Sequence, residues 1–174
     1  MVLKFVDIKS PVLRSKAKKV EKIDKKVKDF ISDMKDTLDA QSDPEGVGLA
    51  APQIGKSLQI FIINHKGHND VVINPEIVNI EEFNASKKVK TKLLEGCLSL
   101  PHYYGPLRRS KEITIKFLDE NGKEVNKTYK NFLAQIVQHE LDHLNGVLFI
   151  DRILEQKAKL YKFSNDDWEE VELI

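Results

Sequence analysis

The densest group of chemically active side chains is the segment His139-Glu140-Leu141-Asp142-His143. On a helix, residues four positions apart lie on one face, separated by about 6 Å along the axis. Two imidazoles at this spacing can bind one metal ion, and the intervening glutamate can act on water bound to that ion. The alternative is a chance match on a charged surface helix. The surrounding segment is apolar, however, and burying these polar groups without partners would cost several kcal/mol, so we expect a metal site.

A catalytic site of this kind needs a third protein ligand. One class of metalloprotease has a third histidine six residues after the second, but Phe149 occupies that position. A second class uses a later glutamate, and the candidates stand close to the chain end: Glu155, Glu169, Glu170 and Glu172. The remaining candidate is Cys97, the single cysteine of the chain. A thiolate beside a divalent ion is deprotonated and binds strongly. We therefore expect Cys97, His139 and His143 to bind the ion and to leave one position for water.

Cys97 lies in the segment Glu95-Gly96-Cys97-Leu98-Ser99-Leu100-Pro101. A lone thiol cannot form an internal disulfide and would most often be a small buried apolar residue. Gly96 allows the backbone to bend before the thiol, and Pro101 stiffens the chain after it. The segment is thus suited to presenting the sulfur from a bent loop.

A third segment, Gly46 to Gly55, reads GVGLAAPQIG and is rich in small residues. Three of these match the spacing of a dinucleotide-binding loop, but that loop must follow a strand, and the preceding residues, 42–45, are Ser-Asp-Pro-Glu. Small residues also allow a bound peptide backbone to approach closely. Gln53 is a polar side chain in an apolar stretch and is suited to donating a hydrogen bond to an oxyanion.

Two helices and several short strands must position these segments. Apolar residues recur at helical spacing from Ile23 to Leu38, with Asp24 as the N-cap. A second helix is expected from Asn131, as its cap, to Asn145, followed by Gly146, and it is apolar on two sides. Strands are expected at residues 58–64, 71–74, 77–80, 89–94, 113–117 and 125–130, with a hairpin turn at Asn121-Gly122. The pattern predicts an α+β fold: antiparallel β-sheets packed around a buried central helix that carries the HExxH motif, with an N-terminal helix.

Composition limits the other possibilities. At 174 residues, the chain fits one domain, residues 1–174. The 28 basic and 27 acidic residues give a net charge of +1, which gives no reason to expect nucleic acid or an anionic membrane as a partner. The first ten residues lack the apolar core of a signal peptide, and no apolar run approaches a membrane span, so we expect a cytoplasmic protein.

The three segments GVGLAAPQIG, EGCLSLP and QHELDHLNG, in this order and at these separations, closely resemble the signature motifs of the peptide deformylase family. The likeness extends to Pro11-Val12-Leu13-Arg14 and to Gly146-Val147-Leu148-Phe149. The family resemblance implies hydrolysis of the formyl group on N-formylmethionyl nascent peptides, with release of formate. A zinc metallopeptidase is the alternative, but it would share only the histidine helix.

The resemblance also implies the roles of individual residues. Cys97, His139 and His143 would bind one divalent metal, usually Fe²⁺ in bacterial members, with Zn²⁺, Ni²⁺ or Co²⁺ able to occupy the site. Glu140 would be the general acid and base, and the Gln53 side chain and Leu98 backbone N–H would stabilise the oxyanion. Backbone groups of three residues would hold the peptide in an extended pose: Val47, Gly48 and Gly96. The methionine pocket would be lined by Val47, Phe132, Gln135, Ile136 and His139, although some members have an apolar residue at the position of Gln135.

Two further expectations concern partners and surface. Some family members carry a basic C-terminal helix that docks on the ribosome, whereas here Lys157, Lys159 and Lys162 are followed by an acidic stretch. We expect a monomer with at most transient ribosome association. Arg108-Arg109 is expected either in a solvated turn or against the downstream part of the substrate.

Overall fold

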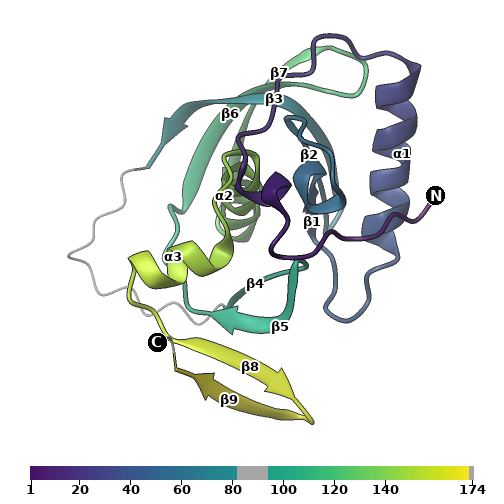
Figure 1. Cartoon of the computed structure of the whole chain (residues 1–174). Helices are drawn as coiled ribbons and strands as arrows, with labels where there is room; N and C mark the ends of the chain where they lie inside the picture. The colour runs from purple at the N-terminus through teal and green to yellow at the C-terminus, as the bar shows by residue number, and fades with distance from the viewer. Residues whose placement is uncertain (82–93, 173–174) are drawn as a thin grey trace.

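A computed structural model describes residues 1–81 and 94–172, and these form two antiparallel sheets with three α-helices between and around them (Figure 1). The five-stranded sheet has the order β1 (Gly48–Ala50), β2 (Ile60–His65), β3 (His68–Ile80), β6 (Glu112–Leu118), β7 (Glu124–Lys130). The four-stranded sheet has the order β4 (Glu95–Cys97), β5 (Leu100–Gly105), β8 (Leu160–Ser164), β9 (Asp167–Val171). The α-helices are α1 (Lys25–Asp39), α2 (Phe132–Leu144) and α3 (Phe149–Glu155), and short 3-10 turns lie at Pro11–Arg14 and Ala51–Ile54.

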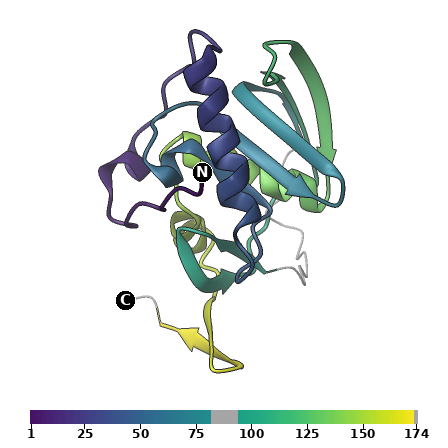
Figure 2. The ribbon, with the colours of Figure 1, turned by 90° about the vertical axis from the view of Figure 1, so that its right-hand side faces the viewer.

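The five-stranded sheet separates two cores. Ile60 and Ile62 of β2 pack with α1, whereas Phe61 and Ile63 pack with α2 on the opposite face. Neighbouring side chains of a strand point to opposite faces, so the continuous apolar run of β2 is explained by the helix on each side. Figures 1 and 2 show α1 and α2 on opposite sides of this sheet. The expected α+β arrangement with antiparallel sheets and an N-terminal helix is therefore present.

Helix α2 is buried over most of its length, from Ala134 to Leu144 with the exception of Gln135. It packs against β1, β2, β6 and β7. Gly146 adopts φ +74°, and a Cβ there would meet the carbonyl oxygen of Arg14 at 2.6 Å. A left-handed residue with no side chain thus ends the helix, as the sequence predicts. This helix carries His139, Glu140 and His143 into the interior.

The remaining sequence expectations have mixed outcomes. Asp24 caps α1 by accepting a hydrogen bond from Val27 N. The prediction that Asn131 caps α2 is wrong: its φ is 54° and its side chain makes no cap hydrogen bond, while its N–H donates to Lys111 O. The separate strands expected at 71–74 and 77–80 are one long strand, β3, with register shifts. The strand expected at 89–94 lies almost wholly outside the described residues.

Six of the helices and strands in the described ranges were not expected from the sequence: the short helix α3, the hairpin of β8 and β9, and the strands β1, β4 and β5, which lie in segments expected to be loops. The hairpin projects away from the rest of the molecule in both views (Figures 1 and 2). Residues 160–171, which include the acidic stretch after Lys162, therefore form strands rather than a basic helix. No helix in the described ranges has both the length and the apolarity needed to cross a membrane.

Candidate metal centre and active site

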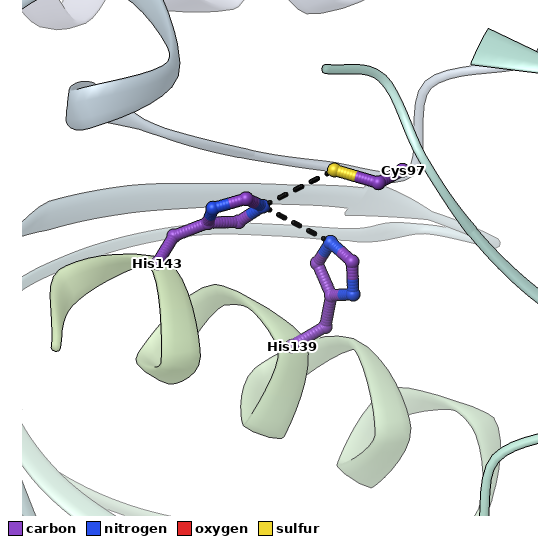
Figure 3. Close-up of side chains that lie close together, drawn as sticks. All are labelled: Cys97, His139 and His143. Carbon is purple, nitrogen blue, oxygen red and sulfur yellow. Dashed lines mark hydrogen bonds between the residues drawn. The ribbon is translucent and has the colours of Figure 1, made fainter. Parts of the chain in front are cut away.

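Three side chains expected to bind metal converge between β4 and α2 (Figure 3). The Cys97 Sγ lies 3.3 Å from His143 Nε2, which lies 3.2 Å from His139 Nε2. One ligand atom from each residue lies within 4.8 Å of the other two. The helical spacing places both imidazoles on one face of α2, and a register shift after Gly96 at the end of β4 redirects the chain at Cys97. Two segments distant in sequence thus meet at a single point.

The chemistry of these donors fits a divalent ion. His139 Nδ1 lies 2.8 Å from Glu95 Oε1, which leaves His139 Nε2 to face the other two ligand atoms. Burial alone would raise the pKa of the Cys97 thiol, but the two adjacent imidazoles lower it well below its ordinary value. Thiolate and imidazole ligands suit both zinc and iron. Over residues 1–81 and 94–172 the group has three members, and none of the late glutamates joins it.

Glu140 is buried beside this group, with 3% of its surface exposed. Its Oε2 has no hydrogen-bond partner within the described part of the chain. Burial raises the pKa of Glu140 to about 7, and the neighbouring histidines act in the opposite direction. A buried carboxylate oxygen without a partner is costly, which points to a polar group that is not part of the chain.

Gln53 reaches the same place from the turn after β1. Its Oε1 accepts a hydrogen bond from Ala50 N at 2.9 Å. Its Nε2 donates to Ser99 Oγ at 3.1 Å and lies 3.6 Å from Cys97 Sγ. The amide is 1% exposed, so its orientation is fixed by these contacts, and its N–H₂ group faces the thiol.

One cavity contains nearly all of the predicted residues. Those that line it are Val47, Gly48, Gln53, Gly96, Cys97, Leu98, Phe132, Gln135, Ile136, His139 and Glu140. His143 is buried behind them, with 1% exposed. Six further lining residues were not expected from the sequence: Pro44, Glu45, Leu94, Glu95, His102 and Tyr104. The substrate and catalytic residues inferred from three separate segments thus share one concave surface, the usual form of a small-molecule or peptide site.

A buried ionic network supports His139, and the sequence analysis did not find it. Arg109 donates to both oxygens of Glu95 at 2.7 and 3.0 Å and to Asp142 Oδ2 at 2.7 Å. Arg152 donates to both oxygens of the same aspartate. Burial alone would raise the pKa of Glu95, but the hydrogen bonds and charges of His139 and Arg109 lower it to about 2.

The expectation of a solvated or substrate-contacting Arg109 is therefore wrong, because its side chain is only 9% exposed and is neutralised by two carboxylates. The signal was present in Glu95 and Asp142, which neighbour the ligands in sequence. The arginine that joins them could be assigned only once the fold was known.

The chain is similar to known proteins over most of its length. The family profile described as polypeptide deformylase matches residues 2–159. The peptide deformylase of Pseudothermotoga lettingae is 44% identical over 153 residues, which cover 88% of this chain and 84% of that protein. That of Dictyoglomus thermophilum is 41% identical over 161 residues, covering 91% and 97%.

Solved structures give the same result. The peptide deformylase of Legionella pneumophila superposes with a TM-score of 0.77 at 38% identity and covers 90% of both chains. The Thermotoga maritima enzyme superposes with the same score and identity and covers 87% of this chain and 97% of its own. With most of the chain matched in sequence and in fold, the protein belongs to the polypeptide deformylase family, whose members are hydrolases that remove N-formyl groups from nascent peptides.

Proposed function

We propose that this cavity removes the formyl group of N-formylmethionyl peptides with one bound divalent ion, and that α2 is a metal-binding HExxH helix. The observation that carries the proposal is the convergence of Cys97, His139 and His143 beside the Glu140 carboxylate, which has an oxygen without a partner among the described residues. The ion would be held by these three ligands. Fe²⁺ is proposed as the native ion, with Zn²⁺, Ni²⁺ or Co²⁺ able to occupy the site. When bound, the ion supplies Lewis acidity, which polarises the formyl carbonyl and lowers the pKa of water.

Glu140 is proposed to move the proton. Its buried carboxyl has a pKa of about 7, which suits a group that must both accept and release a proton near neutral pH. It would accept a proton from the water that attacks the formyl carbon and then deliver this proton to the leaving amine, so that formate and a free N-terminus are produced. Its position against β1 keeps the carboxylate directed at the cavity.

Gln53 and Leu98 are proposed to stabilise the carbonyl oxygen as it becomes negative. The Gln53 amide oxygen is held by Ala50 N, so its Nε2 remains the donor that faces the cavity. Leu98 follows the metal ligand directly and also lines the cavity, so its backbone N–H is the second proposed donor. Fixed donors of this kind act most strongly in a site that excludes water.

The peptide is proposed to bind in an extended pose between the two sheets. Strands β1 and β4 each stand at the end of their sheet, and Gly48 and Gly96 on them line the same cavity together with Val47. Backbone groups at such edges can pair with an added strand. The methionine side chain would occupy the part of the cavity formed by Val47, Phe132, Gln135 and Ile136. We further propose that residues 1–174 act as one catalytic domain, as a cytoplasmic monomer that meets ribosomes transiently.

Formate release from formyl-Met-Ala-Ser tests this function. Metal-loaded protein is expected to release one formate for each peptide consumed, with no cleavage of an internal peptide bond. Cleavage of internal bonds at a higher rate than deformylation would instead support the zinc metallopeptidase alternative. That alternative is disfavoured because the third member of the ligand group is a cysteine rather than a histidine or glutamate.

A further inference from the structure

The two faces of the four-stranded sheet differ in character. Tyr104 of β5 pairs with Tyr161 of β8, and Phe163 of β8 pairs with Trp168 of β9. Since alternate residues of a strand share a face and cross-strand partners lie side by side, these four rings share one face, which we name the aromatic face. The opposite face carries Tyr103, Leu160 and Val171, which pack into the core beneath α3.

The aromatic face is exposed and ordered by its own contacts. Trp168 is 49% exposed, and none of the other three rings is fully buried. The Trp168 ring lies edge-on to Tyr104 with a centroid distance of 5.4 Å and is 4.9 Å from the Phe163 ring. Contiguous exposed apolar surface of this kind commonly marks a binding site. Rings that already contact one another lose little freedom when a ligand binds.

This face continues directly from the catalytic cavity. Tyr104 lines the cavity, and its ring covers Gly96 so closely that a Cβ there would meet ring atoms at 2.7 Å. A peptide held along Gly96 therefore lies next to the aromatic face.

The rim next to this face is acidic. Asp43 and Glu45 are exposed, and neither forms an ion pair with any residue in the described ranges. Glu45 and Pro44, which follow Asp43 in the chain, line the cavity together with Tyr104, whose pKa is raised by burial and by the Asp43 carboxylate. Of the nearby lysines, Lys159 is paired with Glu170, the cross-strand partner of Tyr161 on the aromatic face, and Lys162 lies over Tyr103 on the opposite face. Aromatic rings beside unpaired carboxylates favour a cation over a neutral or acidic group.

We propose that the aromatic face binds a basic side chain located downstream of the formylmethionine in the substrate, with Trp168 and Tyr104 as the stacking surface. The inference rests on the proposed function and specifies the class of peptide that the site prefers. Arginine suits this surface best, because its planar guanidinium stacks on rings and also pairs with carboxylates. A glutamate at the same place would face Asp43 and Glu45 and should be disfavoured.

The test measures kcat/KM for formyl-Met-Ala peptides that carry arginine, leucine or glutamate at each of the next few positions. For the wild type, arginine at one of these positions should exceed leucine by about two- to fivefold, the effect of one exposed cation–ring contact, with glutamate lowest. Trp168→Ala should bring the ratio of kcat/KM for arginine peptides to that for leucine peptides down to about one, and Trp168→Phe should keep most of the wild-type ratio. Ser164→Ala is the matched control, since this residue lies in the same hairpin on the other face, and the ratio should be unchanged.

The outcomes separate the two proposals. If formyl-Met-Ala-Leu peptides release no formate, the proposed function itself fails. If all peptides are deformylated and arginine gives no advantage at any position, or if leucine exceeds arginine, the proposed basic preference is overturned. A shift of Trp168→Ala from dimer to monomer in sedimentation, with an unchanged arginine-to-leucine ratio, would instead assign the face to self-association and also overturn the proposal.

Discussion

The backbone of Gly48 in β1 packs directly against the carboxylate of Glu140 in α2. A Cβ at position 48 would overlap Glu140 Oε1 and approach Ile136 Cγ2 to 3.0 Å. The glycine is therefore needed for space rather than for backbone freedom, and it brings the strand proposed to bind the peptide into contact with the proposed proton carrier.

Gly48→Ala should displace the Glu140 side chain while leaving the ligand group intact. We expect kcat/KM for formyl-Met-Ala-Ser to fall by about 100-fold, the effect of a misplacement near 1 Å, with unchanged metal content. Steady-state kinetics and elemental analysis of the same preparation check this. Wild-type activity in this variant would show that Glu140 does not need its present position.

Glu140→Gln removes the proton carrier but keeps its shape. Turnover should fall by about 10²- to 10⁴-fold with metal still bound, which a formate assay with elemental analysis measures. Retained activity would refute the role assigned to this carboxylate.

The same substitution should alter stability in the metal-free protein. The pKa of Glu140 is about 7 when folded against a reference of 4.5, so the native state holds the extra proton and stability decreases as the pH rises from 4.5 to 7. Metal-free Glu140→Gln lacks this ionisation and should be more stable than the wild type at pH 8, by about 1–3 kcal/mol. Urea unfolding at pH 5 and pH 8 tests the sign. A wild type that gains stability relative to the variant between these two values would contradict it.

Two substitutions at Gln53 separate its two hydrogen-bonding roles. Gln53→Ala removes both and should cost roughly 3 kcal/mol in transition-state stabilisation. Gln53→Glu keeps an acceptor for Ala50 N but replaces the donor that faces the cavity. If the donor acts on the oxyanion, the glutamate variant should be at least as slow as the alanine variant. Near-normal turnover by Gln53→Glu would assign this residue to structure alone.

Glu95 should influence metal binding through His139. Glu95→Gln leaves a side chain of the same size without the charge that orients the imidazole and pairs with Arg109. We expect a 10- to 100-fold loss of metal affinity in chelator competition, the usual effect of changing a residue that orients a ligand. Unchanged affinity would limit the network to a structural role.

This carboxylate also predicts acid sensitivity. The pKa of Glu95 is lowered from 4.5 to about 2 on folding, so its contribution to stability is complete above pH 4.5 and is lost as the pH falls toward 2. Metal-free Glu95→Gln should lack this part of the pH dependence between pH 4.5 and 2. Identical acid-unfolding profiles would contradict the assignment.

Much of the site could be predicted because its chemistry depends on short local patterns. The spacing of His139 and His143 places two imidazoles on one helical face, and Gly146 ends that helix for a conformational reason visible in the sequence. No local pattern joins Cys97 to these histidines, because Cys97 meets them only through the packing of β4 against α2. Elimination of the other candidate ligands, and then the family resemblance, indicated Cys97 from the sequence alone.

The parts that were missed depend on contacts between distant segments. Arginine side chains are usually exposed, but the Arg109 side chain is buried because it pairs with Glu95 and Asp142. Asn131 has the residue type of a helix cap, but its backbone conformation, φ 54°, is incompatible with capping. The hairpin of β8 and β9 is charged and short, and only the strand register reveals that Tyr161, Phe163 and Trp168 share one face while Leu160 and Val171 share the other.

Titration of metal-free protein with Fe²⁺ under anaerobic conditions, with formate release from formyl-Met-Ala-Ser as the readout, tests the central claim most directly. Activity should rise linearly to one equivalent and then stay constant, and Cys97→Ser should need a large excess of metal because a serine hydroxyl ionises far less readily than a thiol. Formate release that is independent of added metal, or that keeps rising to two equivalents, would contradict a single ion held by Cys97, His139 and His143.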